Sequence, residues 1–214
     1  SLEDETVLAS TTRAAHVVDR LLEASLNAAL GRRGMKTFLG EGGLAVVLEV
    51  PSASWISALE DTIQRIRPDA EVVGVVPSKR RSDSSTFNEA RAARTLAEGK
   101  AIVVVTTDRR GLLPNSLLST ADLVTSLETP TLAAVRRVID SICTGSARGL
   151  RKGDVVGLGL FHIAYAIRPG PARASIERLR AATRAKVAET VEWADAPLVD
   201  DLQDFGLEGI DHLR

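Results

Sequence analysis

The residues best placed to do chemistry follow an apolar run, Ala101–Val105, and read Thr106-Thr107-Asp108-Arg109. A buried parallel strand delivers polar side chains to its carboxyl end, where α/β sheets place their binding sites. These hydroxyl, carboxylate and guanidinium groups could therefore face a ligand pocket that takes a nucleotide or another small anion. The alternative is a strand-to-helix turn in which Thr107 or Asp108 caps the next helix.

Two further basic segments could reach an anion. Arg173 follows Arg168-Pro-Gly-Pro-Ala and could extend toward a nucleotide. Alternatively, these prolines only begin a helix, because proline fits a first helical turn. Lys79-Arg80-Arg81 lies in a polar loop that could contact phosphate or an acidic partner, including the acidic C-terminal residues of this chain. The alternative for this loop is ordinary solvation.

The remaining candidate residues do not form a hydrolytic or metal-binding pattern. His16, His162 and His212 lie far apart and lack the spacing of metal ligands, so packing or surface roles are expected for them. Cys143 is the only cysteine, which excludes an internal disulfide and a cysteine-rich zinc site. We expect it to be a small buried hydrophobe in a chain from a reducing, cytoplasmic compartment. Ser82–Ser85 lacks a nucleophile-elbow pattern.

Strands alternate with helices over the first 130 residues. Apolar runs predict strands at Leu44–Val50, Glu71–Val76, Ala101–Thr106 and Asp122–Leu127. Helical periodicity predicts helices at residues 4–33, Trp55–Arg67 and Asn88–Glu98, with Gly31 and Gly34 at the end of the first. This alternation is typical of a parallel, doubly wound sheet with right-handed crossovers.

From Pro130 onward the pattern is helical only. Helices are expected at Thr131–Cys143, Leu160–Ile167 and Arg173–Lys186, which indicates a small helical subdomain attached to the sheet domain. The last stretch, Glu189–Arg214, holds eight acidic residues and few strong apolar repeats. It is interpreted as a linker or a surface-wrapping segment.

Composition fits one α/β domain with a smaller appendage. The chain has 214 residues, of which 44% are hydrophobic and only 3% aromatic, so Ala, Val, Leu and Ile must fill the core. A formal net charge of −1 gives no electrostatic reason to expect nucleic acid as a partner. No apolar run approaches the ~20 residues that span a bilayer. The Ser1-Leu2 start and the end at Arg214 suggest a piece of a longer protein.

The segment from Ala101 to about Ala182 resembles the second half of an AAA ATPase module. In that family a strand ends in Ala-Thr-Asn-Arg, and a Leu-Leu-containing helix, another strand and a helical lid follow. Here VVVTTDRRGLLPNSLLSTADLVTSL has the same order, with Asp108 at the position of the sensor asparagine. The lid would be Thr131–Arg184. The resemblance implies that Thr107, Asp108, Arg109 and Arg173 are remnant sensor positions that bind a nucleotide.

The chain departs from the family at each part that moves a phosphoryl group. A phosphate-binding loop has the form G-x-x-x-x-G-K-[ST], whose backbone amides and lysine hold phosphates. After the first strand this chain has Pro51-Ser-Ala-Ser-Trp-Ile, and the imitation at Gly31–Thr37 precedes that strand. Glu71–Val76 ends without the acidic pair that binds magnesium, and Leu118–Asp122 lacks the arginine finger. We therefore expect this chain to keep the fold of the family but not to hydrolyse ATP.

These observations predict an α/β fold with a short parallel sheet in three layers, a degenerate form of the P-loop NTPase fold, and a C-terminal helical lid. The expected units are an N-terminal helix at 1–36, an AAA-like core at 37–129, the lid at 130–186 and an acidic linker at 187–214.

The function expected from the resemblance is a non-hydrolysing module of a larger AAA ATPase that serves assembly, regulation or substrate presentation. The parent would be a bacterial AAA ATPase or an ATP-dependent zinc protease-like protein. Partners would be its own downstream AAA domain and neighbouring copies, with no resident cofactor beyond weak ATP or ADP binding. The alternatives are a nucleotide- or anion-binding domain without catalysis and an unrecognised α/β enzyme.

Overall fold

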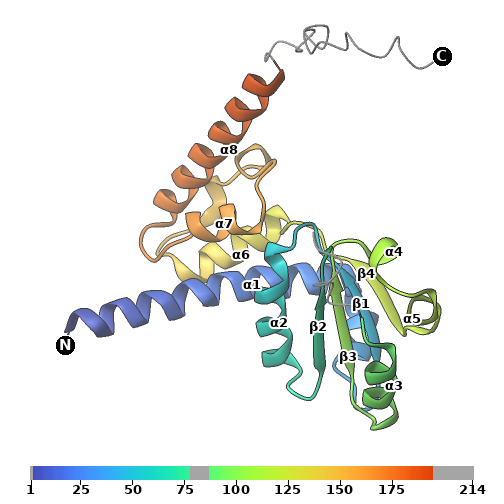
Figure 1. Cartoon of the computed structure of the whole chain (residues 1–214). Helices are drawn as coiled ribbons and strands as arrows, with labels where there is room; N and C mark the ends of the chain where they lie inside the picture. Colours follow the sequence, from blue (N-terminus) through green and yellow to red (C-terminus); the bar gives the residue numbers. More distant parts are fainter. Residues whose placement is uncertain (1, 78–86, 195–214) are drawn as a thin grey trace, which may run out of the picture.

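Four short parallel strands form the one sheet that is seen in the computed structural model, which describes residues 2–77 and 87–194 (Figure 1). The strand order is β2-β3-β1-β4, and β3 and β1 pair from Ile102↔Ala45 to Thr106↔Glu49. All four predicted strands are confirmed, each shortened by one or two residues. Their bounds are Ala45–Glu49 (β1), Glu71–Val75 (β2), Ile102–Thr106 (β3) and Leu123–Ser126 (β4).

Helices cover both faces of this sheet, so the core has three layers, as predicted. Strand side chains alternate between the faces: Leu48 and Val105 pack with one buried cluster, and Val47 and Val104 with the other. Helices α1 and α2 cover the first face, and α3 and α5 cover the second. The helices before β4 are α1 (Leu2–Phe38), α2 (Ser54–Ile66), α3 (Glu89–Ala97), α4 (Arg109–Leu112) and α5 (Asn115–Thr120).

Helix α1 continues beyond its predicted end. It is kinked at Gly31, whose φ of 62° and ψ of −179° are not helical, and it resumes to Phe38. The C-terminal end is held by the buried side chain of Arg67, which donates to the carbonyl oxygens of Phe38 at 2.5 Å and Gly42 at 2.9 Å. A cation at a helix C-terminus satisfies free carbonyls and complements the helix dipole. This contact stabilises the C-terminal end of the helix beyond its two glycines.

A helical lid follows the sheet, as predicted. Its elements are α6 (Leu132–Ile142), the 3₁₀ turns η1 (Ala147–Gly149) and η2 (Lys152–Asp154), α7 (Leu160–Ala166) and α8 (Ala172–Ala194). Helix α1 packs against α6 and α7 of the lid and against α2 and β4 of the core. One hydrophobic cluster therefore runs from the sheet through α1 into the lid. Cys143 is buried in it, as expected, and its thiol donates to the Arg168 carbonyl.

Helix α8 is longer than predicted and contains residues 187–194, where the acidic linker was expected to begin. The remainder of that segment, 195–214, lies outside the described residues, as does the basic loop Lys79–Arg81. Within the described helices, none is both long and apolar enough to cross a membrane.

Helix α2 approaches β2 so closely that Gly74 is required there. A Cβ on Gly74 would lie 2.6 Å from Cγ2 of Ile56 and 2.7 Å from Oε1 of Glu60. Burial raises the pKa of Glu60 above its usual value of 4.5, and the charge of Asp61 raises it further, while a hydrogen bond from the Gly74 amide lowers it. The ionised carboxylate is therefore less favourable in the folded chain than in the unfolded chain.

Truncation of one buried leucine in α1 should destabilise the sheet and the lid together. Leu21 is fully buried in the shared cluster, and Leu21→Ala should lower the free energy of unfolding by about 2–5 kcal/mol. Urea unfolding followed by circular dichroism measures the change and should show one transition. Leu39→Ala is the matched control, because Leu39 is 54% exposed, and should change stability by less than about 0.5 kcal/mol. Separate transitions would contradict a shared core.

The raised pKa of Glu60 predicts a pH-dependent effect of Glu60→Gln. A carboxyl whose folded pKa is raised favours folding while protonated, and this advantage is lost as pH rises from the unfolded pKa through the folded one. The variant should therefore be more stable than the wild type at pH 7 and equally stable below about pH 4. Urea unfolding at the two pH values gives the comparison, and an equal difference at both would contradict the prediction.

Candidate functional site

The carboxyl edge of the sheet is the site that the sequence predicts. Thr107, Asp108 and Arg109 follow β3 directly, so the structure brings these three predicted residues together at this edge. Two residues not singled out from the sequence join them: Glu49 at the end of β1 and Ser126 at the end of β4. The signal for Glu49 was available, because it is a charged residue inside the apolar run of β1.

Glu49 ties the ends of three adjacent strands together. Its Oε2 accepts a hydrogen bond from Ser126 Oγ at 2.9 Å and lies 3.5 Å from Nε of Arg109. Its Oε1 accepts a longer hydrogen bond from the Arg109 amide at 3.3 Å. The carboxylate and the guanidinium are each about 70% buried, at 26% and 31% exposure. Arg109 therefore neutralises an internal carboxylate instead of presenting a free charge to a ligand.

Asp108 caps helix α4. Its Oδ1 accepts hydrogen bonds from the amides of Arg110 at 3.1 Å and Gly111 at 2.9 Å. Two of the free amides of this short helix are thus satisfied by one carboxylate oxygen. The amide of Asp108 itself donates to Oγ1 of Thr106, which is fully buried. This geometry is the helix-capping alternative that the sequence left open.

Arg173 lies apart from the other three predicted residues. It belongs to the first turn of α8, and Figure 1 shows the beginning of that helix far from α4 across the molecule. Its side chain is 89% exposed and donates to Glu177, four residues along the same helix, at 2.9 Å. The structure therefore does not bring Arg173 to the carboxyl edge of the sheet.

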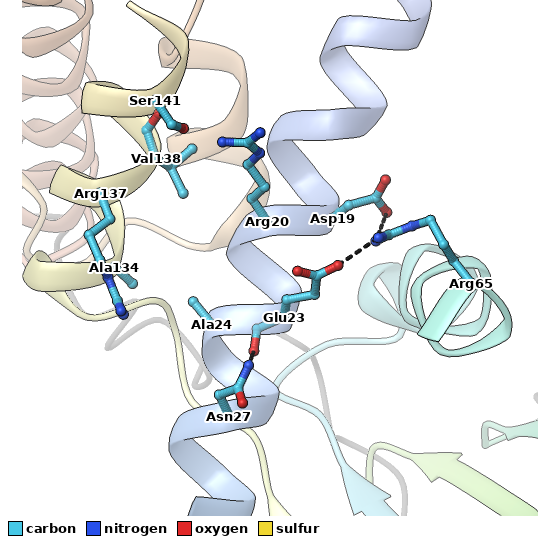
Figure 2. Close-up of a pocket in the computed structure, with 10 residues that line it drawn as sticks. All are labelled: Asp19, Arg20, Glu23, Ala24, Asn27, Arg65, Ala134, Arg137, Val138 and Ser141. Atoms are coloured by element: carbon cyan, nitrogen blue, oxygen red, sulfur yellow. Dashed lines mark hydrogen bonds and ion pairs between the residues drawn. The ribbon is translucent and has the colours of Figure 1, made fainter. Parts of the chain in front are cut away.

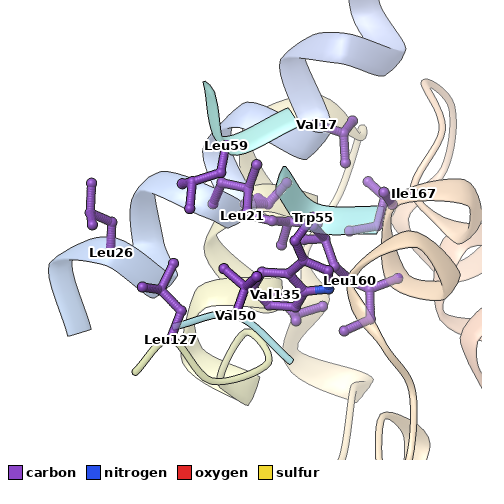
Figure 3. Packing of buried hydrophobic residues seen from close by; sticks show 14 of the residues in the cluster. Val17, Leu21, Leu26, Val50, Trp55, Leu59, Leu127, Val135, Leu160 and Ile167 are labelled. Atoms are coloured by element: carbon purple, nitrogen blue, oxygen red, sulfur yellow. The ribbon is translucent and has the colours of Figure 1, made fainter. Parts of the chain in front are cut away.

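The turn between β1 and α2 is where a P-loop protein would hold phosphate. Here it contains Pro51, which has no amide hydrogen, and two serines whose hydroxyls lie 3.0 Å apart, Ser52 and Ser54. Trp55 follows at once and is 2% exposed. Figure 3 shows its ring among Val50, at the end of the strand, and the lid residues Val135 and Leu160. Hydrophobic side chains thus fill the space between the sheet edge and the lid.

An open groove of about 950 Å³ lies between α1 and α6 (Figure 2). Its walls are charged on the α1 side, where Arg65 of α2 pairs with Glu23 at 2.6 Å and Asp19 at 3.5 Å. The hydrogen bond that Arg65 donates to Glu23 raises the pKa of Arg65, burial lowers it, and the charge of Asp19 raises it again. Arg137 enters from α6 and is exposed. The groove is thus lined by both signs of charge.

No protein-family model matches the chain, and no curated protein matches it. A solved structure of C. elegans PCH-2 aligns with a TM-score of 0.35 and 9% identity, over 88% of this chain and 70% of that chain. A likeness this weak carries no argument, so function is argued from the geometry of this chain. The fold itself is α/β, with an all-parallel four-stranded sheet flanked by helices.

The site offers few groups that are free for chemistry. Its carboxylates and guanidinium are engaged with one another or with a helix end, as described above. Across residues 17–77 and 87–189, the part of the chain whose side chains are described, His, Cys, Asp and Glu form no group of three that could hold a metal ion. With these residues, the edge fixes the ends of the strands to α4.

Substitutions of Asp108 separate a capping role from a ligand-binding role. Asp108→Ala should lower the free energy of unfolding by about 1 kcal/mol, whereas Asp108→Asn should retain nearly all of it, because Asn is an equally good N-cap. Urea unfolding of both variants measures this. If Asn costs as much as Ala, the charge of the carboxylate matters beyond the cap, and a ligand-binding role gains support.

Proposed function

We propose that this chain is a non-hydrolysing AAA-like module that works through protein contacts, in assembly, regulation or substrate presentation for an AAA ATPase. The proposal combines the α/β architecture with the chemistry of its carboxyl edge. The order of elements, with a parallel sheet followed by a helical lid, supplies the scaffold. The edge supplies the reason to expect no phosphoryl transfer.

The observation that carries the proposal is the turn from β1 to α2. A phosphate-binding loop needs successive backbone amides that point inward and a lysine that reaches the phosphates. The turn at 51–54 begins with proline and contains neither glycine nor lysine. The next residue, Trp55, is buried between the sheet edge and the lid. A triphosphate in this position would have to displace an indole from the hydrophobic core.

The internal use of the edge residues supports the same conclusion. Asp108 satisfies the amides of α4, and Arg109 satisfies Glu49. Binding a nucleotide phosphate to Arg109 would leave the largely buried carboxylate of Glu49 with less charge compensation, at a cost in stability. The charged groups of the edge are thus paired within the chain.

The remaining surface suits protein contacts better than catalysis. The open groove between α1 and α6 presents Arg137 from one wall and the Asp19–Arg65–Glu23 network from the other. Charges of both signs along a groove set the register of a protein partner more than they add affinity. This feature supports an interaction role within the proposed function.

Titration with ATP and ADP in the presence of Mg²⁺ tests the proposal. Calorimetry should show no binding heat above dilution at millimolar nucleotide, and a phosphate-release assay should show no turnover. The physical reason is that no group cradles the phosphates at the β1–α2 turn.

Arg109→Gln is the control that assigns any signal to the site. Nucleotide binding that disappears in Arg109→Gln would favour the alternative function, an anion-binding domain without catalysis. Mg²⁺-dependent hydrolysis that Arg109→Gln abolishes would overturn the proposal. ATP hydrolysis that is unchanged in Arg109→Gln would not depend on Arg109. The same assay on Thr107→Val then shows whether another residue of the sheet edge contributes.

A further inference from the structure

The charges of this chain are strongly segregated, although its net charge is only −1. Residues 131–189, which form most of the lid, contain eleven Lys and Arg against four Asp and Glu, a formal charge of +7. Residues 190–214 contain seven Asp and Glu against one Arg, a formal charge of −6. A small basic unit is therefore followed directly by an acidic one.

Part of the basic charge is concentrated where η1 and η2 pack against α8. The Arg180 guanidinium donates to the carboxylate of Asp154 at 3.1 Å and to the Gly149 carbonyl at 3.0 Å, so it joins α8 to both 3₁₀ turns. Thr183 adds a hydrogen bond to the Asp154 carbonyl at 2.8 Å. Five cationic residues lie on these three elements or directly before η2 and are called the lid cationic patch: Arg148, Arg151, Lys152, Arg180 and Arg184.

The single carboxylate inside the patch is already engaged. Burial alone would raise the pKa of Asp154, but hydrogen bonds from Arg180 and from the Arg151 amide, together with the charges of these two arginines, hold it below its usual 3.8. The side chains of Arg148, Lys152 and Arg184 are exposed and form no hydrogen bond or ion pair with any described residue. Asp154 is thus the one carboxylate that balances the five cations of the patch, and these three side chains have no ionic partner among the described residues.

Exposed apolar side chains beside the patch indicate what kind of anion fits it. Val156 is 56% exposed and Val187 is 58% exposed. The segments that carry them lie side by side, since a Cβ on Gly157 would lie 4.0 Å from Cγ of Lys186. A phosphate backbone would gain nothing from these valines, whereas an acidic peptide with interleaved apolar residues would bury them. The surface therefore favours an acidic, partly apolar peptide.

We propose that the lid cationic patch binds residues 195–214 of the same chain. This segment has the required composition, with six Asp and Glu among leucines, a valine, a phenylalanine and an isoleucine. From Arg184 to the end of α8 at Ala194 the helix rises about 15 Å, and the twenty residues that follow are long enough to return over that distance. Covalent attachment makes the encounter intramolecular, which favours the same chain over a second copy.

A spin-label experiment on the full chain tests this contact, and it does not depend on whether the module binds nucleotide. A nitroxide is attached to Gln203→Cys, and amide signals of the ¹⁵N-labelled chain are recorded with the label oxidised and reduced. The unsubstituted chain carries only the buried Cys143 and reports any labelling there. Amides at Arg148, Lys152 and Arg184 should lose most of their intensity at low salt and recover it at about 1 M salt, where the screening length is about 3 Å.

Two charge-matched variants assign the contact to the patch. Arg148→Gln with Lys152→Gln and Arg184→Gln should abolish the broadening. Neutralisation of Lys79, Arg80 and Arg81 in the same way removes two arginines and one lysine as well, and should leave the broadening intact.

Each other result overturns the proposal. No broadening at low salt means that the segment does not bind the patch, and loss of broadening in the Lys79–Arg81 variant places the contact on that loop. A mixture of nitroxide-labelled unenriched chains with ¹⁵N chains lacking the label should show no broadening. Broadening in that mixture would make a second copy the occupant.

Discussion

The buried face of α1 is the constraint on which the rest of the structure depends. Val17, Leu21, Leu22 and Leu26 are at most 2% exposed, and they belong to the cluster that also contains strand residues and lid residues. Helix α1 contacts α2 and β4 on one side and α6 and α7 on the other. Sheet and lid are therefore two walls around one helix, and neither has a complete core without it.

A shared core has consequences for what the sheet edge can do. In a protein that opens and closes around a ligand, the surface between two units must part, so it cannot be filled with close-packed apolar side chains. Here Trp55 and Val50 from the sheet domain pack with Leu160 from the lid. Opening this surface would expose an indole and several aliphatic chains to water, at about 25 cal/mol per Å². The geometry thus favours a rigid unit that presents surfaces to partners.

The backbone elements could be predicted from the sequence more fully than the site. Uninterrupted runs such as Ile102–Val105 are readable because a strand buried on both faces must be apolar at every position. The extension of α1 past Gly31 could not be predicted in this way. The end of the helix is held by Arg67, which lies 29 residues beyond Phe38 in the sequence and donates a hydrogen bond to the Phe38 carbonyl. Local glycine signals argue for an end there, and a tertiary contact outweighs them.

The site shows the same limit at the level of single side chains. Thr107, Asp108 and Arg109 lie at the edge as predicted, because their position follows from one strand alone. The partner of Arg109 could not be identified in this way, since Glu49 reaches it only through the pairing of β1 with β3. Arg173 was connected to the edge through family resemblance, which assumes a particular lid orientation. Orientation is decided by how α6 and α7 pack on α1, and no local pattern encodes it.

Net charge is an equally incomplete guide, because it sums over segments of opposite charge. A value of −1 excludes little when a unit of +7 and a unit of −6 are joined in one chain. Electrostatic attraction depends on the local field within about 10 Å at 0.1 M salt, a distance much shorter than the length of α8. The lid therefore presents a basic surface to any partner that approaches it, whatever the overall balance. An acidic segment attached to the end of α8 would compete for that surface with every external anion. An external partner would then need an affinity high enough to displace this segment.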